Sequence, residues 1–159
     1  MDELLRLLRR NAMESPTNLA KMLNIDERDV RAKIEEYERR GVIRGYQAIV
    51  DEDKLDLNRV NALIEVKVTP EREGGFDRVA ARISKFPEVE SMYLVSGTYD
   101  LLLFVNGRDL KQVAGFVSEK LSTIEGVIST ATHFMLKTYK KHGILMEAPP
   151  EHERLSVSA

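Results

Sequence analysis

The sequence predicts an α+β protein in which a winged helix-turn-helix unit precedes a ferredoxin-like βαββαβ unit. Residues 1–50 contain three short helical patterns followed by an extended segment. Residues 61–143 alternate in the order strand, helix, strand, strand, helix, strand. Residues 51–60 are charged and rich in turn formers, so we expect a hinge there, and we expect residues 144–159 to form a C-terminal tail.

Composition limits the classes of protein that the chain can belong to. Its 159 residues are 43% hydrophobic with a net charge of −2, which is ordinary for a globular protein with a packed core. No segment approaches the roughly 20 apolar residues of a membrane helix, and the start lacks the basic region of a signal peptide. For this reason we expect no membrane partner. The sequence has no cysteine, which fits a reducing compartment, so we expect a cytoplasmic protein.

The first unit is predicted to hold three helices. Ser15 before Pro16 and Asp26 before an acidic first turn predict the N-caps of the second and third helices. Gly41 predicts the end of the third helix, and residues 42–50 are expected to be extended. The first helix is predicted from four leucines at helical spacing: Leu4, Leu5, Leu7 and Leu8.

A short turn between the second and third helices is typical of helix-turn-helix DNA-binding proteins. On the exposed side of the third helix, arginines can read guanine edges and Glu27 can accept from a cytosine amino group. The predicted DNA-binding residues are Thr17, Glu27, Arg28, Arg31, Lys33 and Arg44. Residues 1–50 hold ten basic and nine acidic side chains, so a plain solvated helix face is the alternative.

Residues 61–68 alternate in polarity, which predicts a strand with one buried face. A helix follows over residues 76–86 and ends at Pro87. The buried positions predicted for this strand and helix are Ala62, Ile64, Val66 and Val68, then Phe76, Val79, Ala80, Ile83 and Phe86.

Residues 89–95 and 101–105 read as strands joined by a hairpin, and residues 127–139 read as the last strand. Asp109 is the predicted N-cap of the helix between them, whose apolar stripe is Leu110, Val113, Ala114, Val117 and Leu121. Both helices of this unit are expected on one face of the sheet. Its other face carries apolar residues, and the simplest partner for it is a second copy of the chain.

The loop between the two hairpin strands holds more polar chemistry than a turn requires. Ser96 and Thr98 supply hydroxyls, Tyr99 an aromatic face and Asp100 a carboxylate, around the single Gly97. Two interpretations stay open on spacing alone. Either Asp100 caps its own turn, or the loop forms a small-molecule site at the mouth of the sheet.

The sequence contains no recognisable motif for catalysis or for metal binding. The three histidines show no ligand spacing with one another, and no serine has a partner histidine at sequence level. The chain also lacks a glycine-rich phosphate loop. We therefore expect no enzymatic activity, no metal and no cofactor.

Three segments follow one another in a characteristic order: Gly41-Val42-Ile43-Arg44-Gly45-Tyr46, then Gly97-Thr98-Tyr99-Asp100-Leu101, then Gly126-Val127 followed by Thr130-x-Thr132. Through these segments the chain resembles the Lrp/AsnC (leucine-responsive regulatory protein) family over residues 3 to 143. The resemblance implies a RAM/ACT-like C-terminal domain. It also implies a sequence-specific DNA-binding transcription regulator of amino-acid or related metabolism, which dimerises through that domain and often forms octamers.

The resemblance further implies a small effector, an amino acid or related metabolite, bound in clefts between dimers. It assigns Gly97, Tyr99 and Asp100 to that site, together with Thr130 and Thr132 of the last strand. From their chemistry, we expect Asp100 to pair with an effector ammonium group, and the hydroxyls, including those of Ser96 and Thr98, to orient its carboxylate.

A second function, from another class, competes with this one. The predicted recognition helix begins with Asp26-Glu27-Arg28-Asp29, which is acidic for a surface that meets phosphates. The alternative is a metabolite-binding sensor or assembly protein whose helix-turn-helix binds DNA weakly or not at all.

Overall fold

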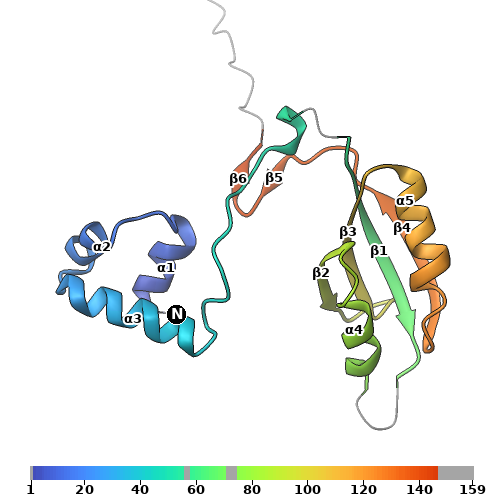
Figure 1. The fold of residues 1–159 in the computed structure, drawn as a ribbon, viewed down its shortest axis with the longest axis horizontal. Coiled ribbons are helices and arrows are strands. Elements are labelled where there is room, and N and C mark those ends of the chain that lie inside the picture. The colour runs from blue at the N-terminus through green and yellow to red at the C-terminus, as the bar shows by residue number, and fades with distance from the viewer. Residues whose placement is uncertain (1, 56–57, 71–74, 147–159) are drawn as a thin grey trace, which may run out of the picture. The chain divides into compact units, whose positions relative to one another are not determined.

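The computed structural model describes residues 2–55, 58–70 and 75–146 of the chain (Figure 1). The chain divides into two compact units, Met1–Val50 and Asp51–Ala159, called here the first and the second unit. Within the described ranges, every helix is too short or too polar to span a bilayer.

The first unit is built of three helices, α1 (Glu3–Arg10), α2 (Pro16–Leu23) and α3 (Glu27–Arg39). Each helix has one apolar side that meets the other two, as helical periodicity predicts. The turn between α2 and α3 is short, and Asn24 in it adopts a left-handed conformation with φ of 53°. The small shared core consists of Leu4, Leu8, Leu19, Ala20 and Val30.

Side-chain caps fix where these helices begin. Ser15 Oγ accepts from the Asn18 N–H at 3.1 Å and Asp26 Oδ1 from the Arg28 N–H at 2.7 Å, so both predicted N-caps are confirmed. Asp2 caps α1 and also accepts from the Tyr37 hydroxyl at 2.6 Å. The Tyr37 hydrogen bond lowers the pKa of Asp2, and the contact ties α1 to α3.

Residues 44–50 are extended but belong to no strand of the described chain. The wing expected after α3 is therefore a single extended segment and not a β-hairpin. The physical reason is that the rest of the first unit is helical, so this segment finds no second strand beside it to pair with.

The second unit contains a four-stranded antiparallel sheet of β1 (Val60–Val68), β2 (Val89–Leu94), β3 (Leu101–Gly107) and β4 (Val127–Phe134). The strand order is β2-β3-β1-β4, so the first and third strands are central. Together with helices after β1 and β3, this is the ferredoxin-like βαββαβ topology that the sequence predicts.

The helices α4 (Asp77–Ile83) and α5 (Leu110–Gly115), and the π-helical turn η2 (Phe116–Leu121), follow β1 and β3. They cover one face of the sheet. Every second side chain of β1 and β3 points to that face and packs in one core with side chains of α4, α5 and η2. That core comprises Ala62, Ile64, Val66, Val68, Val79, Ile83, Leu101, Leu103, Val105, Val113, Phe116 and Leu121. The four predicted β1 positions are thus confirmed.

The apolar stripe predicted after Asp109 is partly wrong. Leu110 is 57% exposed and Ala114 is exposed, whereas Phe116, which the stripe omitted, is buried. The π-helical turn η2 closes an i→i+5 turn in place of i→i+4, which accounts for Phe116 but not for Leu110 and Ala114, since both precede it in α5. Phe116 and Leu121, five residues apart, therefore reach the same core.

The last predicted strand and the predicted tail also differ from the structure. β4 ends at Phe134, and a small hairpin of β5 (Lys140–Lys141) and β6 (Ile144–Leu145) follows. Met146 is buried, and its N–H donates to the Tyr139 carbonyl at 3.0 Å. The tail expected from residue 144 onward therefore begins with an ordered strand, because backbone pairing and Met146 burial hold it; residues 147–159 lie outside the described ranges.

This hairpin contacts the segment predicted to be a hinge. Within that segment the described chain forms a 3-10 turn, η1 (Glu52–Lys54), whereas residues 56–57 are outside the described ranges. Glu52 accepts from Lys141 and from the Asn61 amide, each at 3.4 Å. The start of the second unit is thus fastened to its C-terminal hairpin.

An ion pair between Glu88, which is partly buried, and Lys120, which is exposed, gives the second unit a predictable response to acid. Glu88, 13% exposed at its side chain, accepts from Lys120 Nζ at 2.5 Å, and this bond lowers the pKa of Glu88 below its ordinary 4.5. The unfolded chain takes up this proton first, so the stabilisation is present above pH 4.5 and is lost as pH falls toward the lower folded pKa. Urea unfolding at several pH values should show a shallower acid loss for E88Q, with exposed Glu125→Gln as the unchanged control.

Candidate nucleic-acid interface and effector loop

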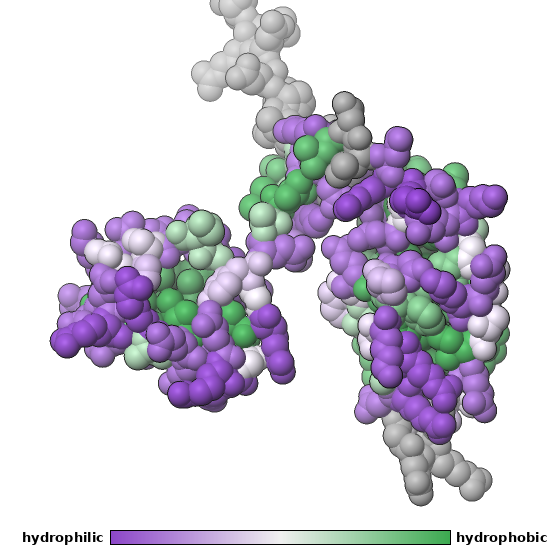
Figure 2. Space-filling view, viewed as in Figure 1, coloured by the Kyte–Doolittle hydropathy of each residue, from purple (hydrophilic) through white to green (hydrophobic). Residues whose placement is uncertain are grey.

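The side of α3 that faces away from the core of the first unit is polar and exposed to solvent. Figure 2 shows hydrophilic residues over it, with the apolar core visible between the helices. Val30 lies on the buried side of α3 and belongs to the core of the first unit, and Ile34 and Tyr37 pack against the same core. The first two turns of α3 therefore present their charged residues to solvent, as base reading in a major groove requires.

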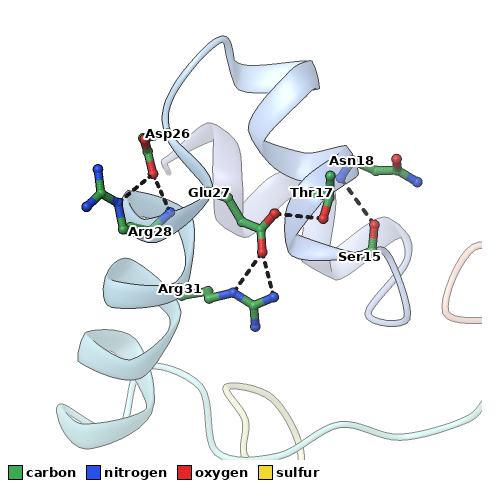
Figure 3. A network of polar contacts seen from close by, with 7 residues as sticks. All are labelled: Ser15, Thr17, Asn18, Asp26, Glu27, Arg28 and Arg31. Atoms are coloured by element: carbon green, nitrogen blue, oxygen red, sulfur yellow. Dashed lines mark hydrogen bonds and ion pairs between the residues drawn. The ribbon is translucent and has the colours of Figure 1, made fainter.

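Three of the predicted DNA-binding residues form one polar cluster that joins α2 to α3 (Figure 3). The Thr17 hydroxyl donates to Glu27 Oε2 at 2.7 Å. Arg31 donates to Glu27 Oε1 from Nε at 2.9 Å and from Nη2 at 2.6 Å. The Thr17 hydroxyl, and next the Arg31 side chain, lower the pKa of Glu27, so Glu27 is ionised at neutral pH.

The other three predicted residues lie outside this cluster. Arg28 Nε contacts Asp26 at 3.3 Å but its side chain is 91% exposed. Lys33 Nζ lies 3.5 Å from Asp2, so it points toward the start of α1. Arg44 follows α3, where its guanidinium lies against the Gly41 backbone. Lys33 thus lies on a different side of α3 from Arg31, as expected for residues two positions apart on a helix.

The 96–100 loop is anchored to the sheet through Asp100. Its N–H donates to the Val66 carbonyl at 3.0 Å, its carbonyl accepts from the Val95 N–H at 2.8 Å, and its Oδ2 accepts from the Val68 N–H at 2.9 Å. Gly97 has a φ of 155°, a conformation that L side chains rarely adopt. Asp100 therefore supports the loop by capping the end of β1, a contact that the sequence analysis missed.

The remaining effector residues are divided between the loop and β4. Ser96, Gly97 and Thr98 are exposed, and Tyr99 is half-buried beside Asp100. On β4, Thr130 lies opposite Val66 and Thr132 opposite Ile64, so both threonines are on the helix-covered face of the sheet.

Strand register separates the two threonines from the loop. Thr130, Val66 and Leu101 form one row across β4, β1 and β3. Two strand spacings, about 10 Å, therefore lie between Thr130 and the residue that follows Asp100.

Among the described residues, no group of histidine and carboxylate side chains could hold a metal ion.

Comparison with known proteins identifies the family. A family model described as the Lrp/AsnC ligand-binding domain matches residues 61–145, more than half of the chain. The chain belongs to the Lrp/AsnC family. The resemblance predicted from the three sequence segments is thereby confirmed, and this Lrp/AsnC protein is a transcription regulator.

Relatives of this Lrp/AsnC protein match over nearly its whole length. An uncharacterised HTH-type transcriptional regulator of Bacillus subtilis, YugG, is 45% identical over 98% of this chain and 95% of its own. The transcriptional regulator NMB0573 of Neisseria meningitidis, solved with L-Met, has a TM-score of 0.69 and 24% identity, covering 96% of this chain and 98% of its own. A feast or famine regulatory protein of M. tuberculosis, solved with L-methionine, has a TM-score of 0.69 and 23% identity over 87% of this chain and 90% of its own.

These comparisons establish the ferredoxin-like fold of the Lrp/AsnC second unit and the regulatory class of the chain. Membership of the family implies DNA binding and self-association. The family consists of transcription regulators, which is the class of protein that the sequence predicts in place of an enzyme.

Proposed function

We propose that the first unit binds a promoter or operator sequence with the first two turns of α3, and that the second unit binds an amino acid at the 96–100 loop. The regulator would act in the cytoplasm as a homodimer that assembles into octamers, with the effector in clefts between dimers. The observation that carries the proposal is the exposed polar cluster at the start of α3, held by α2 in a helix-turn-helix.

The DNA-binding proposal rests on where the arginines lie. Arg31 and Arg28 are both exposed and sit in the first two turns of α3, the part of a recognition helix that meets base edges. Arg44 lies on the extended segment just after the helix, a position suited to a backbone phosphate. Thr17, in the first turn of α2, would meet a phosphate through its backbone N–H, because its hydroxyl proton is donated to Glu27.

The dimer proposal rests on the uncovered face of the sheet. Leu63 and Phe104 point away from the helices and are half-buried, and the Tyr93 ring packs edge-on against Phe104 at 6.1 Å. Tyr93 itself is 53% exposed. An apolar sheet face of this kind gains stability when a second copy covers it.

The effector proposal rests on the loop chemistry and on two relatives solved with L-methionine. One Asp100 oxygen is engaged by the Val68 N–H, whereas Oδ1 accepts no hydrogen bond from the described residues. We assign Oδ1 to the effector ammonium group, and Ser96 and Thr98, both exposed, to its carboxylate. Because β1 lies between them, Thr130 and Thr132 would complete the site from a neighbouring subunit.

Titration with salt tests DNA binding. Duplex from the chain's own upstream region is titrated by fluorescence anisotropy, and log K should fall linearly with log salt by about 0.9 per phosphate neutralised. Arg44→Ala should lower that slope by about 0.9 per chain, because one phosphate contact is lost. Arg6→Ala, an exposed arginine of α1 paired with Glu3, is the control and should leave the slope unchanged.

Absence of binding by the unmodified chain at about 50 mM salt would contradict the DNA-binding proposal and favour the sensor or assembly function. An unchanged slope in Arg44→Ala, with binding retained, would remove only the role of Arg44.

Thermal unfolding tests the effector. A ligand that binds only the native state stabilises it by about 2.7 kcal/mol at 100 times its Kd, so at least one of the twenty amino acids should raise the Tm. L-methionine is the first probe and D-methionine its control. If none of the twenty raises the Tm of the full chain, amino-acid control of this regulator is contradicted.

A further inference from the structure

Acidic residues of α3 and of its N-cap are paired with three arginines of α3 and its C-cap. The pairs are Asp26–Arg28, Glu27–Arg31 and Glu36–Arg40, the last two at i,i+4 spacing. Pairs of this kind on an exposed helix add little stability. They do remove positive charge from a helix that is proposed to meet phosphates, so a pair with contacts beyond an ordinary i,i+4 contact calls for a functional explanation.

Glu27 differs from the other two acids because it also reaches a second helix. Its Oε2 accepts from Thr17 on α2, while its Oε1 accepts twice from Arg31 (Figure 3). Glu36 contacts Arg40 through one bond at 3.0 Å. Both oxygens of Glu27 are thus engaged by the protein, which leaves poor geometry for the cytosine contact expected from the sequence.

The same contacts determine how Arg31 is presented. Nε and Nη2, one edge of the guanidinium, face Glu27, so the end of the group that carries Nη1 and the second Nη2 hydrogen is directed away from it. That end offers two parallel donors, the arrangement that binds guanine O6 and N7. An arginine fixed in this way loses less conformational freedom on binding than a mobile one.

We propose that Glu27, itself held by Thr17 of α2, is a positioning residue that fixes the Arg31 guanidinium, so that Arg31 reads one guanine and Glu27 contacts no base. The proposal rests on the proposed DNA-binding function. The negative charge of Glu27 has a second effect, since it disfavours contacts of Arg31 with phosphates at other registers. Glu27 therefore raises the ratio of specific to non-specific affinity and not affinity as such.

Selection from random duplexes with the full chain defines the preferred site, and a scrambled duplex of equal composition defines non-specific binding. Anisotropy at one salt concentration then gives the ratio of the two Kd values. E27Q and T17V should each lower this ratio roughly tenfold, about the contribution of one bidentate base contact. T17S, which keeps the hydroxyl, should restore it, and sequence preference should relax at a single guanine.

E36Q is the matched control, because it removes the same charge from an i,i+4 pair on the same helix. Its ratio should stay near that of the unmodified chain. In an R31A background, E27Q should cause no further loss, because Glu27 acts through Arg31.

Each of three outcomes would contradict a different part of the proposal. Equal ratios for E27Q and E36Q would show that Glu27 acts only through its charge. A full further loss for E27Q in the R31A background would show that Glu27 contacts a base directly. Failure of the unmodified chain to prefer any duplex would contradict the DNA-binding proposal itself, before any substitution is made.

Discussion

Replacing Ile64 by alanine is expected to lower the free energy of unfolding of the second unit by about 2–5 kcal/mol. Ile64 is fully buried at the centre of β1, between Leu103 on β3 and Thr132 on β4, and packs into the core under α4 and α5. Truncation removes three carbons and leaves a cavity that the surrounding strands can close only in part. Urea unfolding, followed by circular dichroism at fixed protein concentration, measures the loss.

Two comparisons make the Ile64 result specific. Ile64→Val, which removes a single methylene, should cost about 0.5–1.5 kcal/mol. Leu19→Ala should instead destabilise the first unit, whose core is separate. A loss of equal size in both units for either substitution would contradict the division of the chain into two independently packed cores.

Replacing Asp100 by alanine is expected to cost about 1–3 kcal/mol, because the N–H of buried Val68 would lose its acceptor. Asp100→Asn keeps a side-chain oxygen at this position and should cost less. Both substitutions should weaken the amino-acid response, since the asparagine side chain lacks the charge for an ammonium group. Urea unfolding gives the stability, and the ligand-induced change in Tm gives the response.

If Asp100→Ala and Asp100→Asn had the same free energy of unfolding, the hydrogen bond from the Val68 N–H to the side chain at position 100 would not contribute to stability. If both kept the full ligand response, Asp100 would be a structural residue alone.

Local rules account for what the sequence could predict. The two-residue period of β1 gave its buried face directly, because successive strand side chains alternate between the two faces. The N-caps at Ser15 and Asp26 follow from side chains that bond a backbone group two or three residues away. The i,i+4 spacing of Glu27 and Arg31 is visible in the sequence and could have predicted their ion pair.

Contacts between distant segments account for what the sequence could not predict. Asp100 and Val68 are 32 positions apart, and Thr17 meets Glu27 only because the turn brings the starts of α2 and α3 together. Glu27, predicted from the sequence as a base contact, therefore makes an intramolecular contact in the structure, and its proposed role is to position Arg31. The stripe around Phe116 was wrong because a π turn breaks the 3.6-residue period that the prediction assumes.

The π turn η2 also makes one position of the chain tolerant of a change in length. Phe116 and Leu121 now reach the core five residues apart. Deleting exposed Ser118 would set them four apart, the spacing at which two side chains share one face of an α-helix, so the segments before and after would keep their orientation. A one-residue deletion in α3, which contains no π turn, would rotate every later side chain by about 100° around the helix axis. Insertions and deletions should therefore accumulate at η2 during divergence and be excluded from the recognition helix.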